Sequence, residues 1–186
     1  EPFQENEDDA LVRLALTGNA AAFRRLVEKY EKGVFHFCLS RMRSPAEAED
    51  AAQDVFLRAY VSLKTFGLDR SFKTWLFTIA ANRLKSRGMK ILRMAEKLQR
   101  FISEGGPKVS TANPAEDLEN DERARRVRAA VGELPASLRD AVYLHYFEDM
   151  SVKEIAEVLG AGEEAVKSRL FRGRVLLRKK LEDPSE

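Results

Sequence analysis

The sequence predicts an all-α protein in which two small helical domains are joined by a flexible linker. Apolar residues recur at spacings of three and four from Asp9 to about Ser103, the period of an amphipathic helix. Glycine, proline, serine and threonine then gather in residues 104–113, and a helical pattern resumes at Pro114. Near the C-terminus a short helix and a long helix are separated by only a few residues, which is typical of a helix-turn-helix.

Composition limits the kind of protein. The chain has 186 residues, of which 44% are hydrophobic and 33% charged, which is ordinary for a soluble protein and enough for one domain or two small ones. Its formal net charge of +2 is small, but acidic residues gather at the N-terminus and basic ones between Arg83 and Arg100. We expect such segregated charge in a protein that contacts a polyanion at chosen places.

The sequence lacks three kinds of feature, and these absences narrow the possible classes of protein further. Cys38 is the single cysteine, so no internal disulfide and no thiolate metal cluster can form, and a reducing cytoplasm fits. No run of about 18 apolar residues is present, so we expect no membrane insertion, and no export signal is recognisable. No nucleophile–base pair, phosphate-binding glycine loop or metal-ligand spacing appears, so we expect neither an enzyme nor a bound cofactor or metal.

The N-terminal third predicts two helices after an acidic tail. Residues 1–8 form that tail, Asp9 can cap the first helix, and Gly18-Asn19 separates it from the second. His36 lies among apolar residues of the second helix. We interpret it as a packed or edge histidine rather than a metal ligand, because no second ligand-type residue is suitably spaced.

Ser44-Pro45 begins the next helix, with serine as cap and proline in the first turn. Its apolar stripe consists of Ala48, Ala52, Val55, Phe56, Ala59 and Leu63. Off this stripe stand the polar residues Glu47, Asp50, Gln53 and Asp54. Paired carboxylates can bind a divalent cation or act as acid and base, but further ligands or a pocket are not evident. The preference of helix N-termini for acids explains Glu47 and leaves Asp54 unexplained.

A loop over Gly67–Ser71 leads into a predicted helix over Phe72–Arg87. This helix combines aromatic residues with polar and basic ones, a composition suited to single-stranded nucleic acid because bases stack on rings while cations follow the backbone. The alternative is that most of these rings, and the apolar residues Trp75, Leu76, Ile79 and Leu84, are core. The basic side of the helix remains in either case.

The helix-turn-helix has the most specific pattern. Ser151 and Glu154 form a capping box, and Gly160 stands where a left-handed residue ends a helix. A second helix then runs to about Leu181, with Val166, Leu170, Gly173 and Leu177 predicted to face inward. The opposite side presents Glu164, Ser168, Phe171, Arg172 and Val175, flanked by Lys167, Arg174 and Arg169. These groups suit base edges and phosphates; the alternative is a solvated basic helix end.

Taken together, AEDAAQDVFLRAY, SFKTWLFTIAANRL, LPASLRDAVYLHYFEDMSVKEIAEVLG and VKSRLFRGRVLLRKKL resemble an extracytoplasmic-function (ECF) sigma factor of the bacterial sigma-70 family. The resemblance covers about Asp9 to Leu181. It implies a region 2-like domain over 9–103, including a basic helical extension at 89–103, then the linker 104–113 and a region 4-like domain over 114–182. The function implied is promoter recognition and transcription initiation with core RNA polymerase, through its clamp helices and flap.

The resemblance also assigns residues. It implies that Asp50, Gln53 and Asp54 meet the polymerase clamp helices. It implies that the −10 element, as single-stranded DNA, is captured by Phe66, Asp69, Arg70, Ser71, Asn82, Arg83, Lys85 and Arg87. It implies that the −35 element, as duplex, is read by Glu164, Lys167, Ser168, Phe171, Arg172 and Arg174. An anti-sigma factor is the further partner that the family implies.

Two departures and two alternatives accompany the resemblance. Gly162 stands where such proteins often have a serine-like cap and Gly173 where alanine is common, so we expect both to loosen the recognition helix. A free-standing helix-turn-helix regulator is an alternative, although the N-terminal half shows no sensor pattern. We also predict a compact state in which an apolar stripe within 89–103 packs on the domains and hides the polymerase-binding and DNA-binding surfaces.

Overall fold

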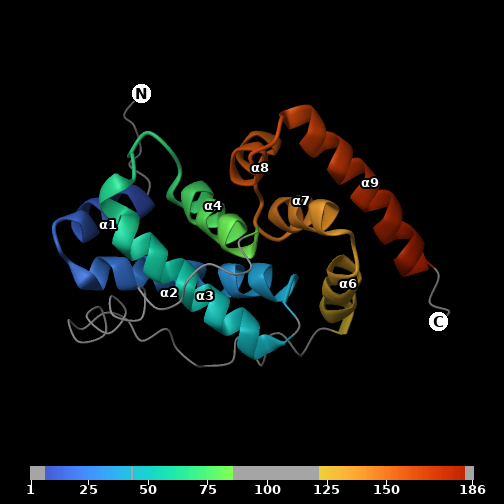
Figure 1. The fold of residues 1–186 in the computed structure, drawn as a ribbon, viewed down its shortest axis with the longest axis horizontal. Coiled ribbons are helices and arrows are strands. Elements are labelled where there is room, and N and C mark those ends of the chain that lie inside the picture. The colour runs from blue at the N-terminus through green and yellow to red at the C-terminus, as the bar shows by residue number, and fades with distance from the viewer. Residues whose placement is uncertain (1–6, 43, 86–121, 183–186) are drawn as a thin grey trace.

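The computed structural model describes residues 7–42, 44–85 and 122–182, and within these ranges the chain is helical with short connections and no strand. This confirms the all-α prediction. Four helices and a 3-10 turn form an N-terminal domain, and four helices form a C-terminal domain (Figure 1). The predicted linker 104–113 and the basic extension 89–103 lie outside the described residues.

The elements follow the sequence order. The N-terminal domain contains α1 (Glu7–Leu16), α2 (Ala20–Leu39), α3 (Pro45–Ser62), η1 (Leu63–Thr65) and α4 (Phe72–Lys85). The C-terminal domain contains α6 (Glu122–Gly132), α7 (Ala136–Tyr146), α8 (Val152–Leu159) and α9 (Glu163–Glu182).

Three predicted helix starts are confirmed by their caps. Asn19 Oδ1 accepts a hydrogen bond from the amide of the third residue of α2 at 3.2 Å. Ser44 Oγ accepts from the Glu47 amide at 3.2 Å, and Pro45 follows it in the first turn of α3. Ser71 Oγ accepts from the Thr74 amide at 3.4 Å at the start of α4. Each cap satisfies an amide that the helix itself leaves without a partner.

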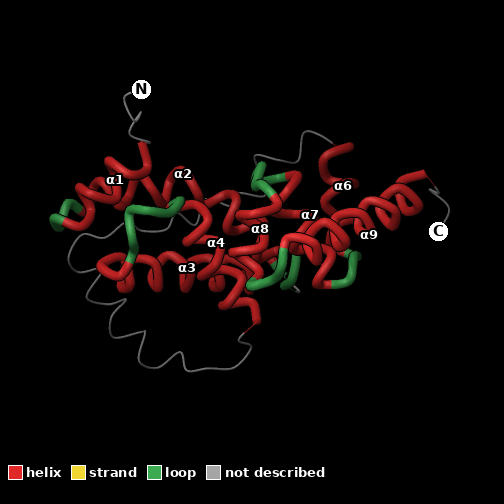
Figure 2. The backbone as a smooth tube through the Cα atoms, turned by 90° about the horizontal axis from the view of Figure 1, so that it is seen from above, coloured by secondary structure: helices red, strands yellow, loops and turns green. Residues whose placement is uncertain are grey.

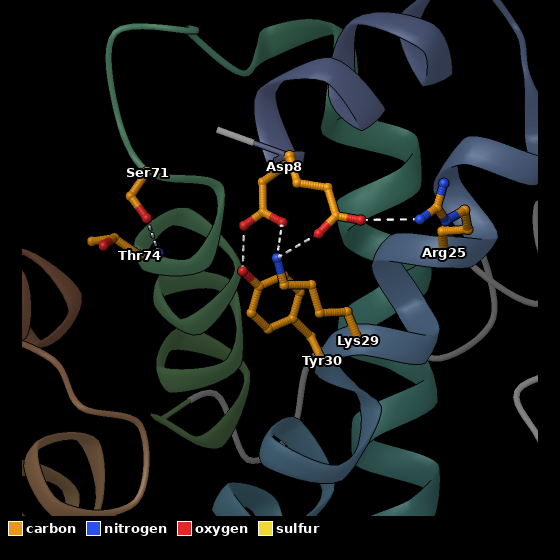
Figure 3. A network of polar contacts seen from close by, with 7 residues as sticks. Asp8, Arg25, Lys29, Tyr30, Ser71 and Thr74 are labelled. Carbon is orange, nitrogen blue, oxygen red and sulfur yellow. Dashed lines mark hydrogen bonds and ion pairs between the residues drawn. The ribbon is translucent and has the colours of Figure 1, made fainter. Parts of the chain in front are cut away.

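The start of α1 differs from the prediction. The helix begins at Glu7, and Asp8, which the sequence placed in an acidic tail, is only 4% exposed. Tyr30 Oη donates a hydrogen bond to one Asp8 oxygen, and Lys29 Nζ lies 2.6 Å from the other (Figure 3). Burial and the bond to Asp8 raise the pKa of Tyr30 far above its usual range. With Arg25, which pairs with Glu7 at 3.0 Å, this network fastens α1 to α2.

The C-terminal domain is the predicted helix-turn-helix with α6 and α7 packed beside it. The capping box is present, since the Glu154 amide donates to Ser151 Oγ at 3.2 Å and the Ser151 amide donates to Glu154 Oε2 at 2.9 Å. Gly160 ends α8 with a φ of 60°, in the left-handed region that glycine adopts without strain.

Gly173 has a packing role that the expectation of a looser recognition helix did not include. Gly173 is buried where α9 crosses α7, and a Cβ built at this position would lie 2.5 Å from Cγ2 of Val142. The glycine therefore allows the two helices to approach more closely than alanine would permit. Gly162 is different: an added Cβ would meet nothing within 4 Å.

The two domains pack directly against each other through α4 and α8, which lie side by side in both views (Figures 1 and 2). Buried side chains of the two domains form one continuous apolar cluster. The rings of Phe37 on α2 and Tyr143 on α7 have centroids 5.4 Å apart across this junction. We call this domain arrangement the closed arrangement.

Candidate nucleic-acid interface

The predicted reading face of α9 is exposed in the closed arrangement. Phe171 is 62% exposed and Val175 53%, and the side chains of Glu164, Lys167, Arg172 and Arg174 are also exposed. Figure 1 shows α9 on the side of the C-terminal domain away from α4. The closed arrangement of the described residues therefore leaves this surface exposed. The predicted compact state depends on residues 89–103, which lie outside the described residues, and it stays a prediction.

Side-chain pairs along the helix order this face. Arg172 Nη2 donates to Ser168 Oγ at 2.9 Å, and Lys167 Nζ lies 2.6 Å from Glu164 Oε1. The hydrogen bond that Lys167 donates to Glu164, followed by the charge of that carboxylate, raises the pKa of Lys167. Exposed donors and an exposed ring on one side of a helix can reach base edges in a major groove, and cations at the rim can meet phosphates.

The three predicted polymerase contacts on α3 lie in different environments. Asp50 is exposed and Gln53 half-buried. Asp54 pairs with Arg83 of α4, and its second oxygen lies 3.1 Å from Nε of Arg58. Asp54 and Arg83 were assigned to separate binding surfaces, and the structure brings them together. Exchanging Asp54 for lysine would set three cations against one another, so we expect this change to destabilise the N-terminal domain as well as to alter the polymerase surface.

The loop before α4 contains both exposed and buried members of the predicted −10 set. Asp69 and Arg70 are exposed, whereas Phe66 is 6% exposed, with its ring centroid 5.9 Å from that of Phe72 and 5.1 Å from that of Trp75. Phe66 therefore supports the loop in this arrangement and presents no free ring to a base. Ser71 is exposed and also caps α4, beside the Asp8 network (Figure 3).

One exposed residue of this loop was missed. Leu68 is 38% exposed, next to Asp69. Its signal in the sequence was an apolar residue in an otherwise polar turn. On α4 itself, Asn82 is exposed as predicted, and Arg87 lies outside the described residues.

The C-terminal domain covers one side of α4. Lys85 Nζ donates to the carbonyl of Leu159, the last residue of α8, at 3.2 Å. Lys73 Nζ lies 3.4 Å from Oε2 of Glu148 and also donates to the backbone carbonyl of that residue. Thr74 Oγ1 lies 3.4 Å from Oε1 of Glu154 in the capping box. Cationic and polar groups of α4 are therefore already engaged by the C-terminal domain.

Further polar contacts join α2 and its following turn to α7. Arg41 Nη1 lies 2.9 Å from Oδ2 of the buried Asp140, and Arg139 Nη1 donates to the Ser40 carbonyl at 2.5 Å. Burial raises the pKa of Asp140, although both arginines oppose that shift. Tyr143 Oη donates to the Gly33 carbonyl at 3.2 Å. Local sequence patterns could not predict these bonds, because their partners lie about a hundred residues apart.

Within the described ranges, no group of three or more histidine, cysteine, aspartate or glutamate residues is arranged to hold a metal ion. Burial raises the pKa of the Cys38 thiol to about 12, which makes it a poor nucleophile at neutral pH. In the same ranges, no helix has both the length and the apolar character needed to span a bilayer.

One helical domain presents an exposed helix-turn-helix, and the second contains a helix with basic and aromatic residues. This combination is typical of a DNA-binding transcription protein. Two family models match the chain: Sigma-70 region 2 over residues 26–88 and Sigma-70, region 4, over residues 124–177. The ECF RNA polymerase sigma factor SigW of Bacillus subtilis (strain 168) is 30% identical over 178 residues, which is 89% of this chain and 92% of SigW. The RNA polymerase sigma-H factor of Pseudomonas aeruginosa is 31% identical over 185 residues, which is 96% of this chain and 95% of the sigma-H factor.

Solved structures agree. CnrH in complex with the cytosolic domain of CnrY has a TM-score of 0.66 at 26% identity, covering 97% of this chain and 100% of CnrH. The sigma factor RpoE of Bartonella quintana, in complex with the anti-sigma factor NepR, has a TM-score of 0.65 at 25% identity. The match covers 86% of this chain and 96% of RpoE. The chain belongs to the ECF sigma factors of the sigma-70 family, as the resemblance indicated.

Proposed function

We propose that this chain binds core RNA polymerase and directs it to promoters by reading the −35 element with α9 and capturing the opened −10 element with α4 and its preceding loop. The exposed reading face of α9, held on a capped helix-turn-helix, is the observation that carries this proposal. The chain would contribute binding only, since RNA synthesis is the chemistry of the polymerase. This role places it in the cytoplasm with the polymerase.

For the −35 element, Arg172 is the strongest candidate for direct base readout. Its guanidinium can donate two parallel hydrogen bonds to a guanine edge, and Ser168 already orients it. Phe171 can contact a thymine methyl group. Lys167 and Arg174, at the rim, suit phosphates and would add affinity without sequence information.

For the −10 element, the exposed residues Asp69, Arg70 and Asn82 are candidates for direct contact, with Leu68 added to the set. Lys85 would follow the strand backbone once its bond to the Leu159 carbonyl is released. Phe66, Ser71 and Arg83 would act by positioning the loop and the helix, because the first is packed, the second caps α4 and the third pairs with α3.

For the polymerase, Asp50 is the candidate for a direct contact with the clamp helices, since it is exposed on α3. Gln53 lies three residues further along, half-buried. Asp54 would add to this surface while holding α4 in place through Arg83. The flap would then contact the C-terminal domain.

We further propose regulation by an anti-sigma factor that stabilises the closed arrangement. RpoE of Bartonella quintana is solved with its anti-sigma factor NepR, and CnrH with the cytosolic domain of CnrY. In this chain the closed arrangement engages α4 and leaves α9 exposed. Closure would therefore block promoter opening more strongly than −35 recognition.

Two variants serve as each other's controls in reconstituted transcription with core polymerase. Asp50→Lys should abolish co-purification with core polymerase while leaving the circular dichroism spectrum unchanged. Arg172→Ala should keep core binding and lose discrimination across a −35 mutation series, by about 1–3 kcal/mol for a bidentate base contact. Unimpaired assembly by the first variant, or unchanged discrimination by the second, would contradict the corresponding surface. Tight duplex binding without polymerase would favour a free-standing regulator.

A further inference from the structure

A cavity of about 380 Å³ opens at the junction of the two domains. Its walls include His36 and Leu39 from α2, Arg125 and Arg128 from α6, and Tyr143 and Phe147 from α7. Sites for small molecules typically have volumes of about 300–1,000 Å³ and often lie between domains. This cavity belongs to neither the α9 reading face nor the α4 surface.

The charges around the cavity have one sign. Arg125 and Arg128 line it, and among the described residues no carboxylate lines it and neither guanidinium has an ion-pair partner. The Arg128 guanidinium carbon lies 5.7 Å from the ring centroid of Phe147, so that cation sits against an apolar wall. Such a site attracts an anion that also carries a hydrophobic group.

His36 lines the cavity with a neutral ring. Burial, followed by the positive charges of Arg128 and Lys32, lowers the pKa of His36 to about 4, so the ring is neutral at pH 7. Its Nε2 is shielded from solvent and therefore from the cavity, so the ring adds no charge and no free hydrogen-bonding atom to the wall. The charge that lines the cavity thus comes from Arg125 and Arg128.

We propose that this cavity binds a small apolar carboxylate. Its carboxylate would pair with Arg125 and Arg128, whose planar guanidinium groups match carboxylate geometry, and its hydrocarbon part would lie against Leu39, Tyr143 and Phe147. Because the walls come from both domains, the occupied cavity exists only in the closed arrangement. A ligand present at 100 times its dissociation constant would raise the ratio of closed to open chains roughly 100-fold.

The binding test uses the full chain and sodium decanoate as the probe, titrated by calorimetry below its micelle concentration. We expect saturable binding of one decanoate per chain. The Arg125→Gln, Arg128→Gln double variant and Ala129→Trp, which fills the cavity from its α6 wall, should each weaken binding at least 10-fold. Arg126→Gln is the matched control, since Arg126 is exposed on the same helix and does not line the cavity. Decanol, which lacks the charge, should bind at least 10-fold more weakly.

Equal binding of decanol, or equal loss in the Arg126→Gln control, would show non-specific adsorption and overturn the proposal. Coupling to closure is measured by the distance between spin labels on cysteines introduced at Ser62 and Ser137, with buried Cys38 left in place. Decanoate should increase the short-distance population, and an unchanged distribution at saturation would overturn the linkage. Of these outcomes, only the effect on transcription rests on the proposed function. If decanoate binds and closes the chain without lowering transcription, the proposed role of α4 is contradicted, whereas the binding site is not.

Discussion

The ion pair between Asp54 and Arg83 allows its contribution to the free energy of unfolding to be predicted. It joins α3, which is assigned to polymerase binding, to α4, which is assigned to promoter opening. Replacing either residue by alanine should destabilise the N-terminal domain. Replacing both should cost less than the sum of the two single changes, because the double variant leaves neither Asp54 nor Arg83 facing the site of a lost partner.

The magnitude follows from burial. The side chain of Asp54 is 20% exposed and that of Arg83 is 23% exposed, so the pair lies between the surface and the interior. Exposed pairs contribute about 0.2–1 kcal/mol and hydrogen bonds to charged groups about 1.5–3 kcal/mol. We therefore expect a coupling free energy of about 1–2 kcal/mol. Arg58, which stays in every variant, lies 3.1 Å from the other Asp54 oxygen and does not affect the difference.

The assay is a double-mutant cycle by urea unfolding of the full chain, with Asp54→Ala, Arg83→Ala and the double variant. Unfolding free energies that add within about 0.3 kcal/mol would show that the two side chains do not interact, and would refute the reasoning. A functional readout accompanies the cycle. Asp54→Ala should reduce strand opening, measured by permanganate footprinting, when enough core polymerase is added to bring the holoenzyme to the wild-type amount.

The remaining predictions concern packing and pH. Gly33→Ala should displace the Glu148 carboxylate, since a Cβ there would lie 2.5 Å from it, and should weaken the pair between Glu148 and Lys73; the closed population in label distances should fall, and Gly132→Ala, with nothing within 4 Å, is the control. Gly173→Ala should destabilise the C-terminal domain by about 1–3 kcal/mol in thermal or urea unfolding, and an unchanged stability would refute the close helix crossing. For Glu154, burial raises the pKa but the bonds from Ser151 and Thr74 hold it below its usual value, so its stabilisation is complete above the unfolded pKa and is lost as pH falls through the folded one. The stability difference between wild type and Glu154→Gln should therefore shrink on acidification, and a constant difference would contradict these bonds.

Local patterns allowed much of the fold to be predicted. The caps at Ser44 and Ser151, and the glycine that ends α8, depend on residues within four positions of one another, so both partners are evident in a short stretch of sequence. The same holds for the break at Gly18-Asn19, where Asn19 proves to cap α2. The faces of α9 followed from the same local periodicity, and Val166 is indeed buried while its outward neighbours are exposed.

The misses have a common physical cause. Asp8 was assigned to a tail because the local pattern indicated no partner for it, yet Tyr30, 22 residues away on α2, donates a hydrogen bond to it. Asp54 has a local partner, Arg58, four residues further along, which the prediction overlooked. Its partner on α4, Arg83, is 29 residues further along. A carboxylate that the local pattern does not explain is therefore a useful signal of a tertiary partner, although it does not identify that partner.

The glycines show a second limit of local reasoning. A helix-interior glycine costs about 0.5–1 kcal/mol relative to alanine in isolation, which led to the expectation that Gly173 weakens α9. The free-energy cost of alanine at this position is set by Val142, a neighbour on α7 that no local pattern reveals. Gly33 is the same case between domains, because its missing side chain makes room for Glu148.

The contacts of α4 imply a direct competition between the closed arrangement and promoter DNA. Lys85 donates to the carbonyl end of α8, and Lys73 pairs with Glu148, so closure uses the cations that would follow a single strand. Separating the domains therefore leaves Lys85 without its carbonyl partner and Lys73 without Glu148. Phosphates of the captured strand would take the place of these partners. Because the C-terminal domain and phosphates compete for the same two Nζ atoms, capture of the opened −10 strand would favour separated domains. On this argument Lys85→Ala should weaken closure and −10 capture together, whereas Arg172→Ala should affect only the −35 contact, since α9 is exposed in the closed arrangement. Label distances and permanganate footprints of the two holoenzymes would distinguish shared from separate effects, and a Lys85→Ala protein that captures the strand normally would refute the competition.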